Sequence, residues 1–298
     1  MRSVNLIFGN PNIVNIKKRF AMSTSIDNAF IKQFEREVHE AYQRQGSKLR
    51  NTVRVINKVQ GSTAVFQKVG TGTASTKSTH GMVPVMNLDH STIEVALSDY
   101  YAGDWVDRLD ELKTNIDERQ VIANAGAHAL GRKTDELIIN ALDGASTHII
   151  TDDNIGLTKA KVLEAFEIFG EGDVPDDGQR FAVVGWKQWS ELLGIEEFVN
   201  ADYIGRDDLP YANITQARMW LGTIWMPHSG LPVDGSDIRS CYFYHKTALG
   251  HASASDVQTD ITWHGDRAAH FVNNMMSQGA GLIDEAGIVV IKCDETPD

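Results

Sequence analysis

Cysteine is scarce in this chain. Only two cysteines, Cys241 and Cys293, occur among its 298 residues, which excludes a small fold held together by a disulfide framework. Neither cysteine belongs to a Cys-x-x-Cys pair, the spacing typical of redox motifs. We therefore expect two reduced, buried thiols. One long-range disulfide bridge and a redox role are the alternatives.

An excess of basic charge is also missing. The chain has 28 Lys and Arg against 40 Asp and Glu, for a net charge of -12. A protein that grips a nucleic-acid backbone presents a Lys/Arg surface that displaces counterions from the phosphates, and no such cluster is visible. The acidic balance argues against stable nucleic-acid binding. It does not exclude a container for DNA, because an acidic inner wall leaves the enclosed polymer mobile.

Long apolar runs are absent, since no stretch approaches the roughly 18 residues that a membrane span needs. Near the start, the basic residues 17–19 follow the apolar residues Ile13, Val14 and Ile16, which is the reverse of the order in a signal peptide. Codons for residues 17–19 can resemble a bacterial ribosome-binding site just upstream of Met22. We therefore expect the natural chain to start at Met22, with residues 1–21 a mis-annotated upstream extension. A genuine basic arm is the alternative.

Motifs for catalysis or ligand binding fail on their spacing. The histidines at 245 and 251, and those at 264 and 270, do not have the i, i+4 spacing of a helical zinc site. The glycines near position 70 lack the Gly-Lys-Ser/Thr of a phosphate loop, and no Gly-x-Ser-x-Gly turn occurs. The acidic clusters do not have calcium-loop spacing. We expect no catalytic residue, cofactor or metal. An α/β hydrolytic or metal-dependent enzyme remains the alternative, because a triad meets only in the fold.

The first third of the chain predicts an arm followed by a long hairpin. Residues 22–50 carry an apolar residue every four positions, typical of an amphipathic helix that docks on a partner surface. Residues 51–69 and 92–97 alternate as strands do. The Gly/Thr/Ser-rich stretch Gly70–Ser91 is unusually long for a connection inside a compact domain. It predicts a two-stranded arm whose tip projects and takes its contacts from a partner.

We expect eight residues of this arm to form its contact surface. The residues expected to form the assembly interface are Phe66, Val69, Thr71, Thr73, Lys77, Met82, Val85 and Met86.

The strongest helix signal covers residues 115–143. Thr114 stands three residues before Asp117 in a weak capping-box pattern, and Gly144 follows as a stop signal. A helix of this length extends for about 40 Å, long enough to span a whole domain. The residues expected to form its inward face are Val121, Ile122, Ala125, Ala129, Leu137, Ile138, Ala141 and Leu142.

Residues after 150 alternate between helix and strand signals, which indicates an α/β region. Helices are expected at 158–170, with Leu163, Phe166 and Phe169 inward, and at 186–193, with Trp186, Trp189 and Leu193 on one side. A buried strand is expected between them. Strands are predicted at 181–184, 218–226, 238–247, 257–263 and 288–291, whereas residues 265–277 are compatible with helix or strand.

The order of these features resembles the major capsid proteins of tailed double-stranded DNA phages. The resemblance is to the HK97-type fold, and most nearly to the capsid proteins of T7-like short-tailed phages. No single segment is diagnostic, and the order and spacing over most of residues 22–298 carry the likeness. The matching segments are Val55–Val69, Ser98–Asp110, Asp117–Gly144, Phe181–Trp189 and Phe198–Tyr203. Lys77 alone is too little to predict the covalent cross-linking seen in some members.

The resemblance implies an α+β HK97-type capsid fold with an N-terminal arm, an extended β-hairpin loop, a long spine helix in a peripheral domain, and an α/β axial domain. The implied boundaries are 22–50 for the N-terminal arm, 51–97 for the extended loop, 98–150 with 255–298 for the peripheral domain, and 151–254 for the axial domain.

The implied function is structural: a subunit that assembles with itself into hexamers and pentamers of an icosahedral shell. The shell encloses double-stranded DNA without binding it specifically, and no membrane is involved. The short N-terminal arm implies a separate scaffolding protein, and a portal is a further implied partner. The subunit is expected in the host cytoplasm during assembly and then in the virion. A capsid-like bacterial compartment, such as an encapsulin or gene-transfer particle, is the alternative with the same fold.

Overall fold

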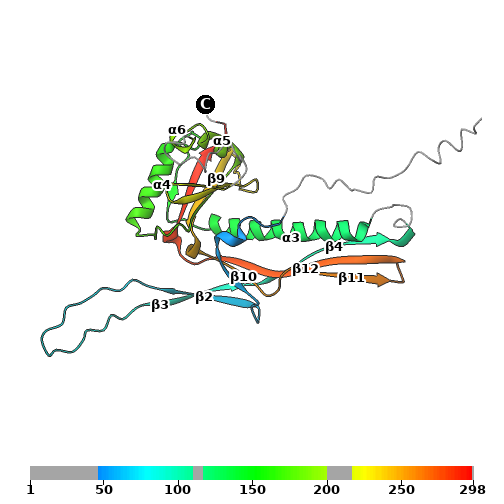
Figure 1. Cartoon of the computed structure of the whole chain (residues 1–298), viewed down its shortest axis with the longest axis horizontal. Coiled ribbons are helices and arrows are strands. Elements are labelled where there is room, and N and C mark those ends of the chain that lie inside the picture. The colour runs from blue at the N-terminus through cyan, green and yellow to red at the C-terminus, as the bar shows by residue number, and fades with distance from the viewer. Residues whose placement is uncertain (1–45, 110–116, 200–216, 297–298) are drawn as a thin grey trace, which may run out of the picture.

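A computed structural model describes residues 46–109, 117–199 and 217–296. Figure 1 shows three parts: an α/β body at one end, a long flat layer of strands under a helix, and a thin two-stranded arm that projects from the region between them. The expected helix within 22–50, the proposed start at Met22, the Thr114 cap and residues 200–203 all lie outside the described residues, wholly or in part. Among the described helices, none has the length and apolar composition to cross a membrane.

The flat layer is a five-stranded sheet built around one long strand, β12 (Ala269–Leu282). On one edge, β12 pairs antiparallel with β4 (Ser98–Asp107). On its other edge it pairs first with β11 (Gln258–His264) and then with β10 (Leu249–Ser253), which is joined in parallel by β1 (Arg54–Asn57). The stretch 265–277, which the sequence left open between helix and strand, therefore belongs mainly to a strand.

The long helix α3 (Glu118–Asp143) lies along this sheet over β4 and β12 (Figure 1). Asp117 is its N-cap, and the Asp117 side chain accepts a hydrogen bond from the backbone N–H of Gln120. The C-terminal part of the predicted inward face is confirmed at Ile138 and Leu142, which are buried.

The N-terminal part of the predicted α3 face is wrong. The positions buried there are Gly126, Leu130, Thr134 and Asp135, whereas Val121, Ile122, Ala125 and Ala129 are only half-buried. Polarity on the sheet explains the difference. The β12 residues Asn274 and Gln278 are fully buried on the side that faces the helix, and a small or polar helix position fits against them. Apolar periodicity cannot find such a face.

The α/β body is a six-stranded sheet in the order β5-β13-β9-β6-β8-β7. Its strands are β5 (Ile149–Ile150), β13 (Ile288–Asp294), β9 (Ile238–His245), β6 (Arg180–Val184), β8 (Thr223–Pro227) and β7 (Arg218–Trp220). Its helices are α4 (Lys159–Glu171), α5 (Trp186–Leu192) and α6 (Glu196–Val199). This body holds the larger hydrophobic core, in which Trp189, Trp225 and Phe243 are almost wholly buried.

Two inward positions predicted for the helices of this body are corrected. Leu163 is 44% exposed and Trp186 is 45% exposed. In α4 the buried face is instead Lys161, Val162, Ala165 and Phe169. The ammonium of Lys161 donates to the backbone carbonyls of Asp152, Ile155 and Lys292, which makes its burial tolerable. Because a lysine lies on the buried face of α4, a prediction from the spacing of apolar residues alone chose the wrong face.

The predicted strands are confirmed with changed limits. The segment 218–226 is two antiparallel strands, β7 and β8, joined at Leu221 and Gly222, which both have positive φ. The segment 238–247 ends as a strand at His245 and continues as the 3-10 turn Lys246–Ala248. Two further 3-10 turns cover Arg50–Thr52 and Glu285–Gly287.

The expected division of the chain also changes at two places. Strand β13, expected in the peripheral part, lies in the six-stranded sheet between β5 and β9, where Ile288 and Val289 are fully buried. Strand β10, expected in the axial part, belongs to the five-stranded sheet. The chain therefore crosses between the two bodies at residues 246–249 and again near 283–287.

The two cysteines are free and buried, as expected. Cys241 lies on β9 and Cys293 on the adjacent strand β13. The contact with the Cys241 thiol, together with burial, raises the pKa of Cys293 far above its ordinary value. Both features keep the thiol protonated, which suits a packing role.

Candidate assembly surfaces

The projecting arm begins as a two-stranded antiparallel sheet. Strand β2 (Thr63–Val69) pairs with β3 (His90–Ala96), and the ladder closes with a hydrogen bond from the Gly70 N–H to the Asp89 carbonyl at 2.8 Å. Between those two residues the chain runs on as a long loop that extends away from the molecule (Figure 1). An isolated two-stranded hairpin is marginally stable in water, so this arm depends on its contacts with the sheet at its base.

The base of the arm rests on a floor of glycines. Phe66 and Val95, from β2 and β3, are buried in a small apolar cluster with Ala64, Ala252 and Ile283. A Cβ added at Gly250 would lie 2.5 Å from the Phe66 ring, and one added at Gly281 would lie 2.5 Å from Val95 Cγ2. Only glycine leaves room for the hairpin to cross the sheet so closely.

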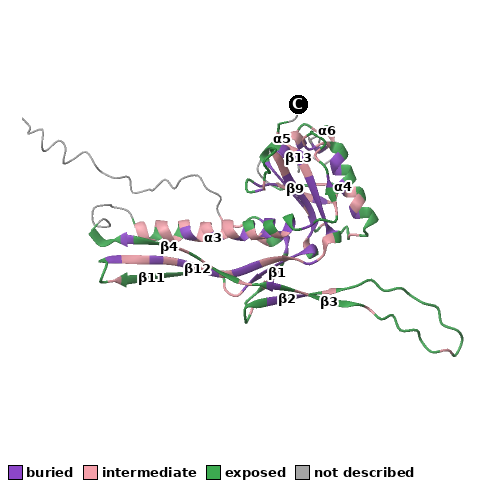
Figure 2. Ribbon diagram, turned by 180° about the vertical axis from the view of Figure 1, so that it is seen from behind, coloured by how far each residue is buried: buried purple, intermediate pink, exposed green. Residues whose placement is uncertain are grey.

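The tip of the arm is apolar and exposed. Met82 is 94% exposed, Val85 is 81% exposed and Met86 is 51% exposed, and Figure 2 shows most of the distal loop in the colour of exposed residues. Thr71, Thr73 and Lys77 are exposed as well. These exposed Met and Val side chains belong to neither of the two hydrophobic clusters of the described residues. Together they form an exposed apolar patch on a thin projection.

Phe66 and Val69 take different roles. Val69 is 50% exposed at the end of β2, so it continues the surface of the tip. Phe66 is fully buried and lies under the guanidinium of Arg54, 5.7 Å from the ring centroid. Phe66 therefore anchors the base of the arm, whereas the other seven predicted interface residues are accessible.

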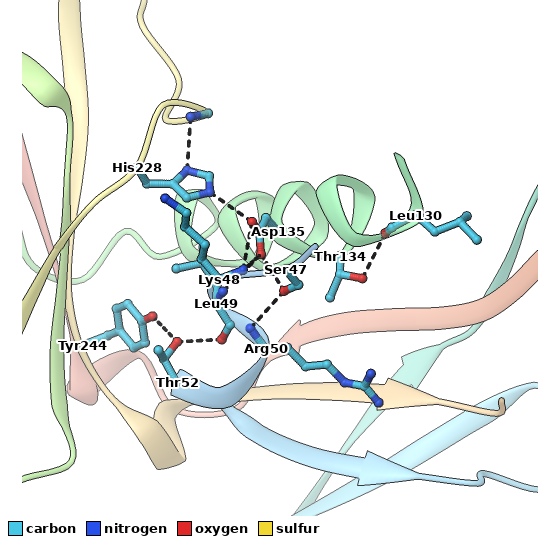
Figure 3. Close-up of polar contacts among 11 residues, drawn as sticks. Ser47, Lys48, Leu49, Arg50, Thr52, Leu130, Thr134, Asp135, His228 and Tyr244 are labelled. Carbon is cyan, nitrogen blue, oxygen red and sulfur yellow. Dashed lines mark hydrogen bonds and ion pairs between the residues drawn. The ribbon is translucent and has the colours of Figure 1, made fainter. Parts of the chain in front are cut away.

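A second site, which is polar, anchors the chain segment that begins at residue 46. Figure 3 shows Asp135, on α3, at the centre of this site. Its carboxylate accepts hydrogen bonds from the Ser47 hydroxyl at 2.6 Å and from the backbone N–H groups of Lys48 and Leu49, each at 3.1 Å. His228, in the segment after β8, approaches the same carboxylate at 3.1 Å. Asp135 thus joins the N-terminal segment, the long helix and the α/β body.

The hydrogen bonds around His228 fix its tautomer. The Gly230 backbone N–H donates to His228 Nδ1, so Nδ1 carries a lone pair and the ring proton lies on Nε2, which donates to Asp135. Burial alone would raise the pKa of Asp135, but the bonds from His228, Ser47, Leu49 and Lys48 outweigh it and hold the pKa below its ordinary value.

The same site contains Ser, His and Asp but lacks the arrangement of a nucleophilic triad. The Ser47 hydroxyl donates to Asp135 and not to His228, so the histidine is not placed to take its proton as in a triad. Asp135 and His228 are 0% and 1% exposed, which also closes the site to substrate. The geometry is that of a structural clamp. Within the described ranges, no group of three His, Cys, Asp or Glu residues could hold a metal ion.

Sequence reasoning missed this clamp. Its one signal is a charged residue, Asp135, one turn before the buried Ile138 and Ile139 on the same helix. A buried carboxylate in that position needs donors, and its donors lie 86 and 93 positions away in the sequence. The sequence carries no indication of which distant residues supply them.

Comparisons with known proteins place this architecture. A family model described as phage capsid protein matches residues 26–295, and the chain therefore belongs to the phage capsid protein family. It is a major capsid subunit, a structural protein that forms a shell and a component of the virion capsid. The search of curated proteins finds no match.

Solved capsid structures share the fold. The capsid of cyanophage P-SCSP1u is 17% identical, with 92% of this chain and 96% of that chain covered and a TM-score of 0.69. The capsid of cyanophage Pam1 is 15% identical over 94% of this chain and 100% of that one, with a TM-score of 0.69. The capsid of a native GTA particle is 14% identical over 92% and 100%, with a TM-score of 0.67.

Proposed function

We propose that this chain is an HK97-type capsid subunit of a T7-like short-tailed phage, and that its hexamers and pentamers tile an icosahedral shell around double-stranded DNA. In this proposal α3 is the spine helix, the five-stranded sheet with α3 is the peripheral domain, and the six-stranded body is the axial domain. The arm at 51–97 is the extended loop. The peripheral domain then comprises about residues 98–148 and 249–282, with the axial domain formed by 149–245 and 288–296.

The observation that carries this proposal is the exposed apolar tip of the arm. Met82 and Val85 are 94% and 81% exposed, and the arm is too thin to bury them. If the arm lies over a neighbouring subunit, each copy gains contacts that an isolated subunit lacks. Many weak contacts of this kind, repeated around a closed shell, add up by avidity without any single strong bond.

The net charge of -12 fits a shell that encloses DNA without holding it. The proposal includes a separate scaffolding protein and a portal as partners, and assembly in the host cytoplasm. It includes no catalytic step. In the buried Ser47–Asp135–His228 group the serine and the histidine both contact the aspartate, so the serine–histidine contact of a triad is not formed.

A capsid-like bacterial compartment is the second candidate, because the fold also matches the capsid of a native GTA particle. The contents of purified particles separate the candidates. Duplex DNA protected from nuclease supports a phage or gene-transfer particle, whereas a protein cargo supports an encapsulin.

Deletion of Gly70–Ser91 tests the assembly role of the arm. Apart from His90 and Ser91, which end the β2–β3 ladder, the deleted segment is almost wholly exposed. The variant is therefore expected to remain soluble, with a nearly unchanged circular dichroism spectrum. It is expected to form no closed shells under conditions in which the full chain does. Normal shells by electron microscopy would refute the proposal. As a matched control, replacement of the segment by an equally long Gly/Ser linker is expected to fail in the same way.

A further inference from the structure

An open groove lies between the start of β1 and the 3-10 turn that follows β9. Its volume is about 420 Å³. Part of its lining comes from Asn51 and the first residues of β1. The rest comes from Gln179, just before β6, and from Lys246 and Thr247 of the 3-10 turn. The groove therefore lies at one of the places where the chain crosses between its two bodies.

The lining of this groove consists mostly of hydrogen-bond donors. It contains two cations, Arg54 and Lys246, two side-chain amides, Asn51 and Gln179, and the hydroxyl of Thr247. We call these five residues the basic groove. Among the described residues, no Asp or Glu lines it. In a chain with a net charge of -12, a surface with only cations and neutral donors is a local attraction for anions.

The two cations of the basic groove are not neutralised by the rest of the described chain. Neither Arg54 nor Lys246 forms an ion pair there. Asp177, two positions before Gln179, is already engaged. It accepts hydrogen bonds from the backbone N–H and the side-chain amide of Gln179 at 3.0 and 3.1 Å, and it lies 3.1 Å from His245. Both cations therefore remain available to an anion from outside the chain.

Contacts with neighbouring residues hold the basic groove in shape. The guanidinium of Arg54 lies 5.7 Å from the centroid of the buried Phe66 ring, and one of its N–H groups reaches the Gln67 carbonyl at 3.5 Å. The backbone N–H of Lys246 donates to the Gln179 carbonyl at 3.1 Å, which ties two parts of the lining together. The groove is therefore formed before a ligand arrives, and this lowers the entropic cost of binding.

We propose that the basic groove binds a phosphate group. A carboxylate has two acceptor oxygens, whereas a phosphate group has three strong ones and so uses more of the five donor side chains. Arg, Lys, Asn, Gln and Thr are also the side chains that contact phosphate oxygens in complexes with nucleic acids. The inference goes beyond the proposed function, because a single subunit in solution has the complete groove.

The phosphate group belongs either to a soluble compound or to the DNA that the proposed shell encloses. A site with two cations neutralises about two phosphate charges, so its contact with duplex DNA is weak and strongly reduced by salt. Such a contact is compatible with a shell that does not hold its DNA.

Calorimetric titration of the subunit with inorganic tripolyphosphate at low salt tests the site. The expected result is saturable binding of one ligand per chain. R54Q combined with K246Q should weaken this binding by about tenfold or more, because two charge-assisted hydrogen bonds are lost. K77Q combined with K187Q is the matched control, since it removes the same charge from exposed positions outside the groove. Its affinity should stay within about twofold of that of the unmodified chain.

Competition then identifies the source of the phosphate group. Displacement of tripolyphosphate by a short DNA duplex assigns the groove to the DNA backbone, and no displacement assigns it to a soluble phosphate compound; both results support the site. The inference is overturned if no saturable binding occurs, or if the groove variant binds as tightly as the control variant. It is also overturned if an oligoglutamate peptide binds more tightly than tripolyphosphate, because the groove would then be a site for an acidic protein. None of these results concerns shell formation, so the proposed function would stand.

Discussion

Gly250 of β10 lies directly beneath the ring of Phe66 of β2, so that a Cβ on the glycine would lie 2.5 Å from the ring. This contact seats the projecting arm on the sheet. G250V is expected to displace Phe66 and loosen the base of the arm at a cost of about 1–3 kcal/mol, as overpacking does. Limited proteolysis should then cut the arm faster. As a control, G235V, at a glycine with open space around it, should leave the cleavage rate unchanged.

The arm tip offers a test by charge. M82D combined with V85D places two carboxylates on the exposed apolar surface, where desolvation in an interface would be costly. The folded subunit should keep its melting temperature, because neither side chain is buried in its own chain, while shell yield by sedimentation should fall at least about tenfold. T76D, at an exposed polar position of the same loop, is the control. Its shell yield should be closer to that of the unmodified chain than the yield of the double variant is.

The clamp at Asp135 predicts a stability defect. D135N keeps the shape of the side chain but removes the charge that four donors stabilise. Losing one partner of a buried, hydrogen-bonded charge costs about 3 kcal/mol, which denaturant unfolding of the subunit can measure. An unchanged midpoint would contradict the clamp. E136Q, one residue further on the exposed side of α3, is the control and should change stability by less than about 0.5 kcal/mol.

Asp135 also predicts the direction of an acid effect. Its pKa is lowered in the folded chain, so its contribution is present above the ordinary carboxyl pKa and is lost as pH falls through that range to the folded value. The difference in stability between the unmodified chain and D135N should therefore shrink on acidification below about pH 4. A difference that stays constant down to pH 3 would argue against an ionised Asp135.

His251 predicts a pH effect nearer neutrality. It is fully buried beneath α3, and this burial lowers its pKa. The positive charge of Arg50 lowers the pKa further, whereas the hydrogen bond to Gln278 at 3.1 Å raises it in part. The unfolded chain therefore binds a proton first as pH falls below about 6.5, and stability declines from pH 7 to 5 with a slope that approaches ~1.4 kcal/mol per pH unit. H251Q should show a flatter dependence in unfolding experiments at matched pH values.

The sequence was informative wherever local chemistry decides structure. Alternation identified β2 and β3, and the Gly/Thr/Ser-rich run between them indicated a projecting arm. The α3 helix followed from its period and from Gly144. These features depend on neighbours within a few positions, so a single sequence contains them.

Features that depend on distant partners were missed or misplaced. The N-terminal part of the buried face of α3 could not be found, because Gly126 and Thr134 pack against Asn274 and Gln278 of a strand that had itself been left undecided. The burial of Lys161 could not be predicted either, because it depends on three backbone carbonyls that accept hydrogen bonds from its ammonium in the folded chain. Phe66 was predicted to lie in the assembly interface, but it is buried at the base of the arm for the same reason. The glycine beneath its ring, Gly250, lies about 180 residues further along the chain.

A three-dimensional reconstruction of the assembled particle by cryo-electron microscopy tests the central claim most directly. The account predicts closed shells in which the loop between Gly70 and Asp89 lies over an adjacent subunit, with Met82 and Val85 in contact with it. A reconstruction in which the loop folds back on its own chain, or projects without contacts, would contradict the claim.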